Sequence, residues 1–200
     1  MLGAVPPPAP ALFETARPRA RAIALRTAPG GAVLARLRDR TEFGTPLVLG
    51  VGAHRGDWVG VITSALPNGR LGWVRRAALR LMPLRTTIVV SIARQRLELR
   101  RGATLLRSLA VGVGSSRTPT PHGRFVVTDK LRGNAVYGCC ILALSGHQPA
   151  VARWWRGDPR LAIHGGRYGA ASYGCLHASD ADLHFLMAHV PLGTPVTIQD

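Results

Sequence analysis

Glycine and proline recur along the whole chain, and their density limits what the chain can fold into. The 200 residues include 23 Gly and 15 Pro. Proline removes a backbone donor and fixes φ, whereas glycine weakens the interior of a helix. This excludes a helical bundle or a coiled coil. With 46% hydrophobic and 18% charged residues, the chain is expected to be a globular, mainly β protein of short strands and many turns.

The charge of the chain is strongly positive and evenly spread. There are 26 basic and 10 acidic residues, for a net charge of +16, and Lys130 is the single lysine. Residues 1–84 contain 12 Arg and 4 acids, and residues 85–200 contain 14 basic residues and 6 acids, so each part carries +8. Such a charge suits nucleic acid, a membrane surface or an anionic cell-envelope polymer. The even split, without a basic tail, argues against nucleic acid.

Neither a membrane span nor an export signal is visible in the sequence. No run reaches the roughly 18 consecutive apolar residues that a transmembrane helix needs. The start, residues 1–8, lacks a basic segment followed by an apolar core. A transmembrane span is therefore not expected, and an export route has to be argued from function.

The first 84 residues divide into two parts. Residues 1–20 contain five prolines and are expected to form an extended Pro/Ala-rich tether. Residues 21–84 contain short apolar runs at 22–25, 33–37, 57–62 and 71–74. The Asn68-Gly69 pair between two of these runs predicts a hairpin. Strands of this length and spacing are typical of a small barrel.

The segments at 57–61 and 69–74 resemble a bacterial SH3-like domain, in which a Gly-Trp-Val strand closes the barrel. The resemblance implies a binding or spacer module, often for cell-wall peptides. Taken singly, Trp58 and Trp73 are better explained as core aromatics.

Residues 85–200 are expected to form a larger unit, mostly β with one main helix. β-Branched or alternating runs at 86–92, 97–100, 105–113, 124–128 and 195–198 predict strands. Ser179 and Asp182 form a capping box, which predicts that a helix begins there. Leu183, Leu186 and Val190 fall on one face of that helix.

The residues most able to carry chemistry lie between 162 and 177. Cys175 follows His164 by eleven residues and precedes His177 by two. A thiol becomes a good nucleophile once ionised, and an imidazole can take its proton. Glycines such as Gly165 and Gly174 let the backbone approach a substrate closely and can present N–H groups to an oxyanion. A buried structural thiol remains compatible with this spacing alone.

This segment resembles the catalytic motif of the L,D-transpeptidase (YkuD-type) family. The motif is an Ile-His-Gly run at 163–165, then Ser-Tyr-Gly-Cys at 172–175. A Gln-Arg-Leu turn at 95–97, a Thr-Pro-rich segment at 118–125 and a closing strand at 193–198 match the family in the same order. The resemblance implies a YkuD-type β-sandwich over residues 85–200, with no metal or organic cofactor.

The resemblance also implies roles for individual residues. Cys175 is the expected nucleophile and His164 the proton donor and acceptor, while the Gly174 and Cys175 N–H groups are the oxyanion donors. Ser172, Tyr173, His177 and Gly165 are the expected substrate-binding residues. The substrate would be a peptidoglycan stem peptide, cross-linked to a neighbouring stem through a thioester.

Two positions depart from the family motif. Tyr173 stands where the family has His before Gly-Cys, and His177 stands where the family has Arg or Asn. An alternative is therefore a catalytically weak or inactive cell-wall-binding protein, and a basic nucleic-acid binder is a more distant one. Peptidoglycan lies outside the cytoplasmic membrane, so an extracytoplasmic location is expected, with a missing upstream segment favoured over a cytoplasmic enzyme.

Three further features have weaker indications. Cys139 and Cys140 are expected to pack within a strand on opposite faces, and therefore not to chelate as a pair. A Zn site using these cysteines or Cys175 lacks C-x₂-C spacing. Residues 154–155, a Trp pair, are candidates for core packing or a substrate flap, and His122 is a possible neighbour of the site.

Overall fold

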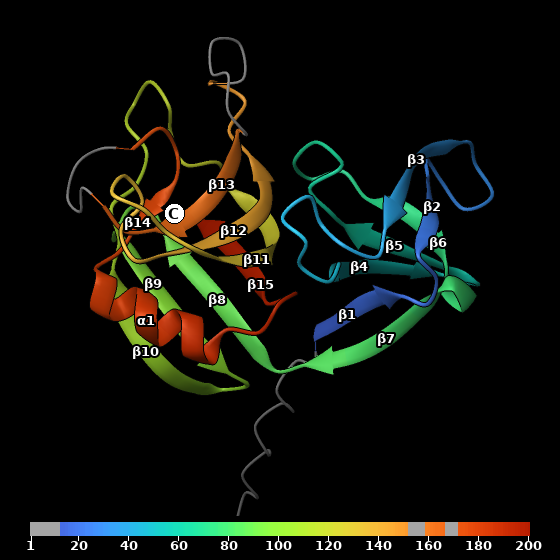
Figure 1. The fold of residues 1–200 in the computed structure, drawn as a ribbon, viewed down its shortest axis with the longest axis horizontal. Coiled ribbons are helices and arrows are strands. Elements are labelled where there is room, and N and C mark those ends of the chain that lie inside the picture. The colour runs from blue at the N-terminus through green and yellow to red at the C-terminus, as the bar shows by residue number, and fades with distance from the viewer. Residues whose placement is uncertain (1–12, 152–158, 167–171) are drawn as a thin grey trace, which may run out of the picture.

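A computed structural model describes residues 13–151, 159–166 and 172–200. Within these ranges the chain is mainly β, as predicted, and contains one α-helix. The strands form two sheets, one in each part of the chain (Figure 1). The Trp pair at 154–155 lies outside the described residues.

The N-terminal sheet has seven strands in the order β3-β2-β6-β5-β4-β1-β7. These strands are β1 (Phe13–Pro18), β2 (Ala22–Arg26), β3 (Val33–Arg38), β4 (Leu49–Arg55), β5 (Trp58–Ile62), β6 (Gly72–Arg75) and β7 (Leu79–Leu84). A short 3-10 turn, η1 (Arg76–Ala78), precedes β7. The core of this unit is a cluster of buried aliphatic side chains that includes Leu25, Leu49, Val59, Val61 and Val74.

The tether predicted over residues 1–20 is in part a strand. β1 pairs with β4 on one side and with β7 on the other. Ala16 in β1 is fully buried in the core of the unit. The proline-rich composition masked this strand because Pro18 lies at its end, where a missing backbone donor does not interrupt the ladder.

The hairpin predicted at Asn68-Gly69 is only half right. β5 and β6 do pair antiparallel, and Gly69 has a positive φ of 77°. The two residues nevertheless lie in a longer loop between Ile62 and Gly72. The Asn68 amide donates to the carbonyl of His147 (2.7 Å), and its oxygen accepts from the His147 N–H (2.8 Å). This loop therefore contacts the second unit instead of forming a tight turn.

The C-terminal sheet has eight strands in the order β10-β9-β8-β15-β11-β12-β13-β14. These strands are β8 (Thr86–Ser91), β9 (Arg96–Arg101), β10 (Thr104–Ala110), β11 (Gly123–Arg132), β12 (Cys140–His147), β13 (Arg160–His164), β14 (Leu176–His177) and β15 (Pro195–Gln199). The register of β11 against β12 shifts between Val127 and Asp129. The core of this unit is one continuous cluster of buried side chains, from Ile88 to Ile198, to which both the strands and the helix contribute.

The helix α1 (Asp180–His189) begins where the capping box predicted. Ser179 Oγ accepts from the Asp182 N–H at 3.2 Å. Leu183 and Leu186 are fully buried and Val190 is 1% exposed. The helix lies along the outer side of the C-terminal unit, next to β9 and β10 in Figure 1. No helix among the described residues has the length and apolar character needed to cross a membrane.

Cys139 and Cys140 do not occupy opposite faces of a strand, so that prediction was wrong. Their sulfur atoms are joined as a disulfide between adjacent residues. Strand alternation does not apply because β12 begins at Cys140, and Cys139 belongs to the preceding turn. The Cys139 carbonyl accepts from the Gly133 N–H at 2.9 Å, which closes that turn.

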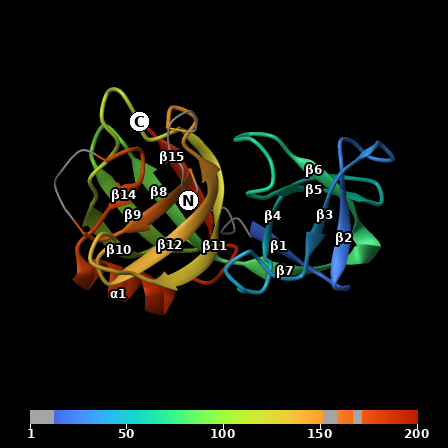
Figure 2. The same cartoon turned by 45° about the horizontal axis from the view of Figure 1, so that its top comes forward.

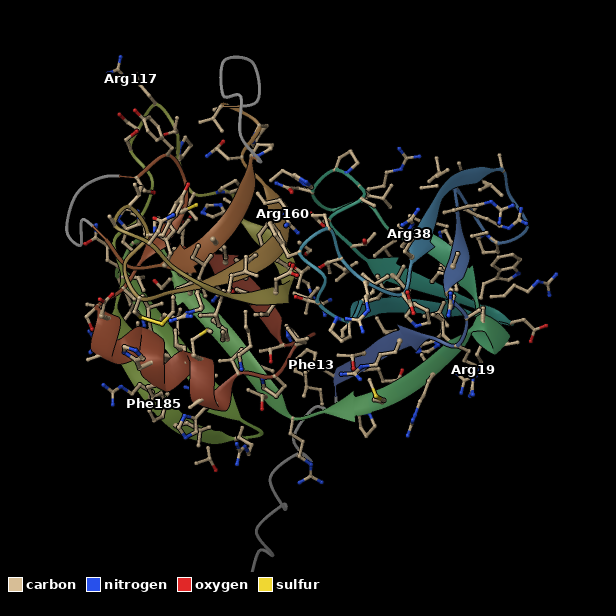
Figure 3. The ribbon with its side chains drawn as sticks, viewed as in Figure 1. Phe13, Arg19, Arg38, Arg117, Arg160 and Phe185 are labelled. Atoms are coloured by element: carbon tan, nitrogen blue, oxygen red, sulfur yellow. A yellow bond between two sulfur atoms is a disulfide. The ribbon has the colours of Figure 1, made fainter. Side chains whose placement is uncertain are left out.

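The two units meet through a buried charge cluster. Figure 2 shows the two sheets side by side, and Figure 3 places Arg160 between them. The Arg160 guanidinium lies 2.8 Å from Glu42 and 3.6 Å from Asp129. Thr41 Oγ1 donates to Asp129 at 2.5 Å, and the Arg160 guanidinium also stacks over the ring of Phe43 (4.7 Å). Residues of both units thus surround one arginine, which comes from the first position of β13.

Candidate active site

β13 and β14 bring the two ends of the sequence motif together. They pair in parallel, with Ile163 opposite Leu176 and His164 opposite His177. Cys175 directly precedes β14, so the nucleophile candidate lies beside the strand that ends at His164. The Ala178 N–H donates to the His164 carbonyl at 3.0 Å and extends this pairing.

The imidazole of His164 is buried and oriented. His164 is 5% exposed, and its Nδ1 lies 2.8 Å from the Gly165 carbonyl oxygen. A carbonyl only accepts, so Nδ1 carries the proton and Nε2 keeps its lone pair. Tyr137 packs edge-on at 4.9 Å, and the ring of His177 lies at 4.5 Å. The ring is thus held as a neutral base.

Burial lowers the pKa of His164 to about 4, with a smaller contribution from the charge of His177 and an opposing one from the Gly165 carbonyl. In the folded protein at neutral pH the ring is therefore uncharged. That is the form able to accept a proton from a thiol.

This depressed pKa predicts acid destabilisation. An unfolded histidine titrates near 6.5, so between about pH 6.5 and pH 4 the unfolded chain binds more protons at this site than the folded one. Acidification through that window is expected to remove roughly 3 kcal/mol of stability at this residue. Denaturant unfolding of the wild type and of His164→Gln at pH 7 and pH 4.5 measures it. The variant should lose less stability on acidification, and an identical loss in both proteins would contradict the argument.

Cys175 is partly buried and is not joined in a disulfide. Its Sγ donates to the carbonyl of Arg160 at 3.9 Å. Arg160 begins β13 and His164 ends it, so one short strand supplies both the contact of the thiol and the candidate base.

Ser172 holds the turn that carries Cys175. Its hydroxyl donates to the Cys175 carbonyl at 2.5 Å and accepts from the Gly174 N–H at 2.9 Å. Its own carbonyl accepts from the Thr118 hydroxyl at 3.1 Å, and the residue is 7% exposed. Ser172, expected to bind substrate, therefore supports the loop. The Gly174 N–H, expected as an oxyanion donor, is already hydrogen-bonded within the loop.

Gly174 takes a backbone conformation that needs glycine. Its φ is +111°, and a Cβ there would collide with the Gln148 amide nitrogen. The same amide donates to the Pro119 carbonyl at 2.6 Å. Gln148 thus links the Thr-Pro segment to the nucleophile turn.

Substituting this glycine should be costly. Gly174→Ala is expected to lower kcat/KM at least about tenfold, because a strained φ costs on the order of 1–3 kcal/mol and the methyl group displaces Gln148. Gly56→Ala is a matched control, since Gly56 also has a positive φ of 53° but nothing lies within 4 Å of the added Cβ. If both variants keep wild-type turnover, the close packing of this turn is not needed for activity.

The remaining predicted site residues differ in accessibility. Tyr173 is 60% exposed and His177 is partly buried against His164. Gly165 is buried; its N–H donates to the Tyr137 carbonyl at 2.9 Å, and a Cβ on it would collide with Asp180. His122 lies 3.2 Å from the carboxylate of Asp200. Of the expected substrate-binding set, Tyr173 is therefore the most exposed.

Three residues of the site were not found from the sequence. Tyr137 packs against the base, Gln148 fits against Gly174, and Arg160 offers its carbonyl to the thiol. None belongs to the motif: Tyr137 and Gln148 flank β12, which pairs with β13, and Arg160 begins the strand that ends at His164. Among the described residues, the group close enough to hold a metal ion is Cys139, Cys140 and His184, which excludes both Cys175 and His164.

Comparison with known proteins covers the C-terminal unit most clearly. Residues 85–198 match the family model described as YkuD, L,D-transpeptidase catalytic domain. L,D-transpeptidase 3 from Mycobacterium tuberculosis, solved with a faropenem-derived adduct, is 16% identical, with a TM-score of 0.49, over 65% of this chain and 73% of that chain. An Enterococcus faecium L,D-transpeptidase mutant is 16% identical, with a TM-score of 0.48, over 75% of this chain and 73% of that chain. No curated protein gave a significant match.

Proposed function

The chain belongs to the YkuD family of L,D-transpeptidase catalytic domains, and from that premise we propose that it is a cysteine acyltransferase that forms peptidoglycan cross-links. Residues 85–200 are the proposed catalytic domain. The donor is a peptidoglycan stem peptide, and the acceptor is a side-chain amine of a neighbouring stem or of a protein to be attached.

In the proposed first half-reaction, His164 takes the proton of Cys175 and the thiolate attacks the donor carbonyl. The C–S bond forms, the amide C–N bond breaks, and the departing amine receives the proton held by His164. The intermediate oxyanion would be stabilised by backbone N–H groups of Gly174 and Cys175. For Gly174 this requires exchanging the hydrogen bond with Ser172 for one to the substrate.

In the second half-reaction, the acceptor amine attacks the thioester carbonyl. His164 removes the proton of the amine, a new amide bond forms, and the C–S bond breaks to regenerate the thiol. Water in place of the amine would release the shortened stem and make the enzyme a carboxypeptidase. No step calls for a metal or an organic cofactor.

The observation that supports this proposal is the pairing of β13, which ends at the buried His164, with β14, which Cys175 directly precedes. The direct test incubates the protein with purified tetrapeptide-stem muropeptides and analyses the products by mass spectrometry. Cross-linked dimers are expected. If correctly folded protein leaves the muropeptides unchanged, the proposal is wrong.

Tyr173 favours a second candidate, a cell-wall-binding protein with a weak catalytic site. A phenol is a far weaker base than an imidazole, so Tyr173 does not replace the histidine that the family has there. The retained pair of Cys175 and His164 favours the enzyme. Muropeptide binding without any turnover would select the binding protein.

The N-terminal unit is proposed as the SH3-like accessory module expected over residues 21–84. Trp73 is 7% exposed and belongs to the interior. Trp58 is partly exposed and lies under the guanidinium groups of Arg26 and Arg75. The net charge of +16 supports binding to anionic cell-envelope polymers, and the peptidoglycan substrate supports an extracytoplasmic location.

A further inference from the structure

A cluster of metal-ligating side chains lies outside the proposed catalytic pair. One ligand atom each from Cys139, Cys140 and His184 lies within 4.8 Å of the others. Cys139 ends the turn that leads into β12, Cys140 is the first residue of β12, and His184 comes from the second turn of α1. Residues more than 40 positions apart in sequence thus converge on one point, as a built metal site requires.

The imidazole of His184 is oriented as a ligand. Its Nδ1 lies 2.8 Å from the carbonyl oxygen of Asp180. A carbonyl only accepts, so Nδ1 carries the proton and Nε2 keeps the lone pair that binds a cation. Metal-binding histidines commonly donate their second ring nitrogen in this way, which fixes both tautomer and ring orientation.

Asp180 also orients the cysteines. Its carbonyl lies 3.8 Å from Cys139 Sγ, and its carboxylate accepts from the Cys139 N–H at 3.2 Å. One residue therefore contacts both the turn and the histidine. Its negative charge adds to the attraction for a cation.

The donor set selects a soft, d¹⁰ cation. Two thiolates and one imidazole are ligands that Zn²⁺ prefers, and three protein ligands leave a fourth position for water. Cys140 is 6% exposed, and burying a charge is costly unless it is compensated. Two thiolates neutralise the charge of the cation and so lower that cost. Vicinal cysteines lack C-x₂-C spacing, but the turn lets both sulfurs face the same side.

We propose that Cys139, Cys140 and His184 form a redox-gated Zn²⁺ site. The disulfide form cannot bind, because its sulfurs are already bonded to each other. A dithiol reductant opens it by exchange, in which the Cys139–Cys140 bond breaks and the reductant is oxidised to its own disulfide. Zn²⁺ then replaces the two thiol protons, which pass to solvent.

The site is placed to influence the proposed active site. Tyr137, whose ring packs on His164, lies two residues before Cys139 in the same turn, and its carbonyl accepts from the Gly165 N–H. Closing the disulfide or binding a cation changes the constraint on this turn. The binding itself is independent of whether the protein cross-links peptidoglycan.

The test measures binding of Zn²⁺ alone by competition with a chromophoric chelator. It uses the full chain with Cys175→Ala, so that the catalytic thiol cannot contribute. Intact mass after thiol alkylation counts the free cysteines in each sample. After reduction, one equivalent of Zn²⁺ is expected to bind, and the oxidised sample should bind none. Co²⁺ in its place should give thiolate-to-metal charge-transfer absorption.

Variants of the two histidines on α1 give a matched comparison. His184→Ala is expected to weaken binding at least about tenfold. His189→Ala should leave the affinity unchanged, although His189 makes the same contact to a carbonyl four residues earlier, at 2.8 Å. Equal binding by oxidised and reduced protein, no binding by the reduced protein, or equal loss in both variants would overturn the proposal.

Discussion

Replacing Cys175 by alanine is expected to reduce formation of cross-linked muropeptides to background, a loss of at least about 10⁴-fold. Removal of a nucleophile leaves only binding and oxyanion stabilisation, and in comparable covalent enzymes such a change costs on the order of 10⁶ in kcat. The side chain is partly buried, its Sγ donates a long hydrogen bond to the Arg160 carbonyl at 3.9 Å, and alanine removes only the sulfur atom. The substitution should therefore leave the fold intact.

Two controls accompany this variant. The denaturation midpoint of Cys175→Ala should stay close to that of the wild type. Arg94→Ala changes an exposed residue in the turn between β8 and β9 and should keep wild-type turnover. Residual activity of Cys175→Ala within tenfold of the wild type would contradict its assignment as the nucleophile.

Replacing Asp129 by alanine is expected to destabilise the protein by about 3–5 kcal/mol, the cost of breaking a buried ion pair from one side. Asp129 is fully buried, and the Arg160 side chain beside it is 5% exposed. The variant removes the acceptor for Thr41 and the buried carboxylate that faces the guanidinium. Equilibrium denaturation monitored by tryptophan fluorescence measures the loss.

Glu42→Ala provides the contrast on the same arginine. Glu42 lies closer to the guanidinium, at 2.8 Å, but its side chain is 58% exposed. Solvent-exposed ion pairs contribute about 0–1 kcal/mol, so this variant should cost little. If Glu42→Ala destabilises the protein as much as Asp129→Ala, burial does not decide the strength of this cluster.

Short sequence patterns correctly predicted the secondary-structure elements that depend mainly on neighbouring residues. The capping box at Ser179 fixed the start of α1, and β-branched runs placed strands such as β8 and β15 to within one or two residues. The motif residues Cys175 and His164 could be predicted as a catalytic pair because their spacing and glycine-rich surroundings are visible in one short segment. In the structure His164 ends β13, and Cys175 directly precedes β14, which pairs with β13.

Tertiary pairing produced what the sequence could not show. β1 was hidden by a proline-rich composition, and it exists because β4 and β7 flank it. The sequence around Asp129 and Arg160 does not indicate that they are buried, because their burial and ion pair depend on contacts between the two units. Ser172 looked like a substrate contact, but buried hydrogen bonds to its own loop occupy its hydroxyl.

The prediction for Cys139 and Cys140 failed because it assumed that both residues lie within one strand. Alternation of side chains holds within a strand, whereas β12 starts at the second cysteine. Because the strand begins one residue later than predicted, the two sulfurs are not held on opposite faces and can bond to each other.

Intact-mass analysis after incubation with a carbapenem shows whether the Cys175 thiol accepts an acyl group. The strained lactam carbonyl is attacked by the thiolate, and ring opening leaves the whole molecule attached as a thioester. We expect one stoichiometric adduct on the wild type and none on Cys175→Ala. A folded protein with a free Cys175 thiol that forms no adduct, or an adduct that persists in Cys175→Ala, would contradict it.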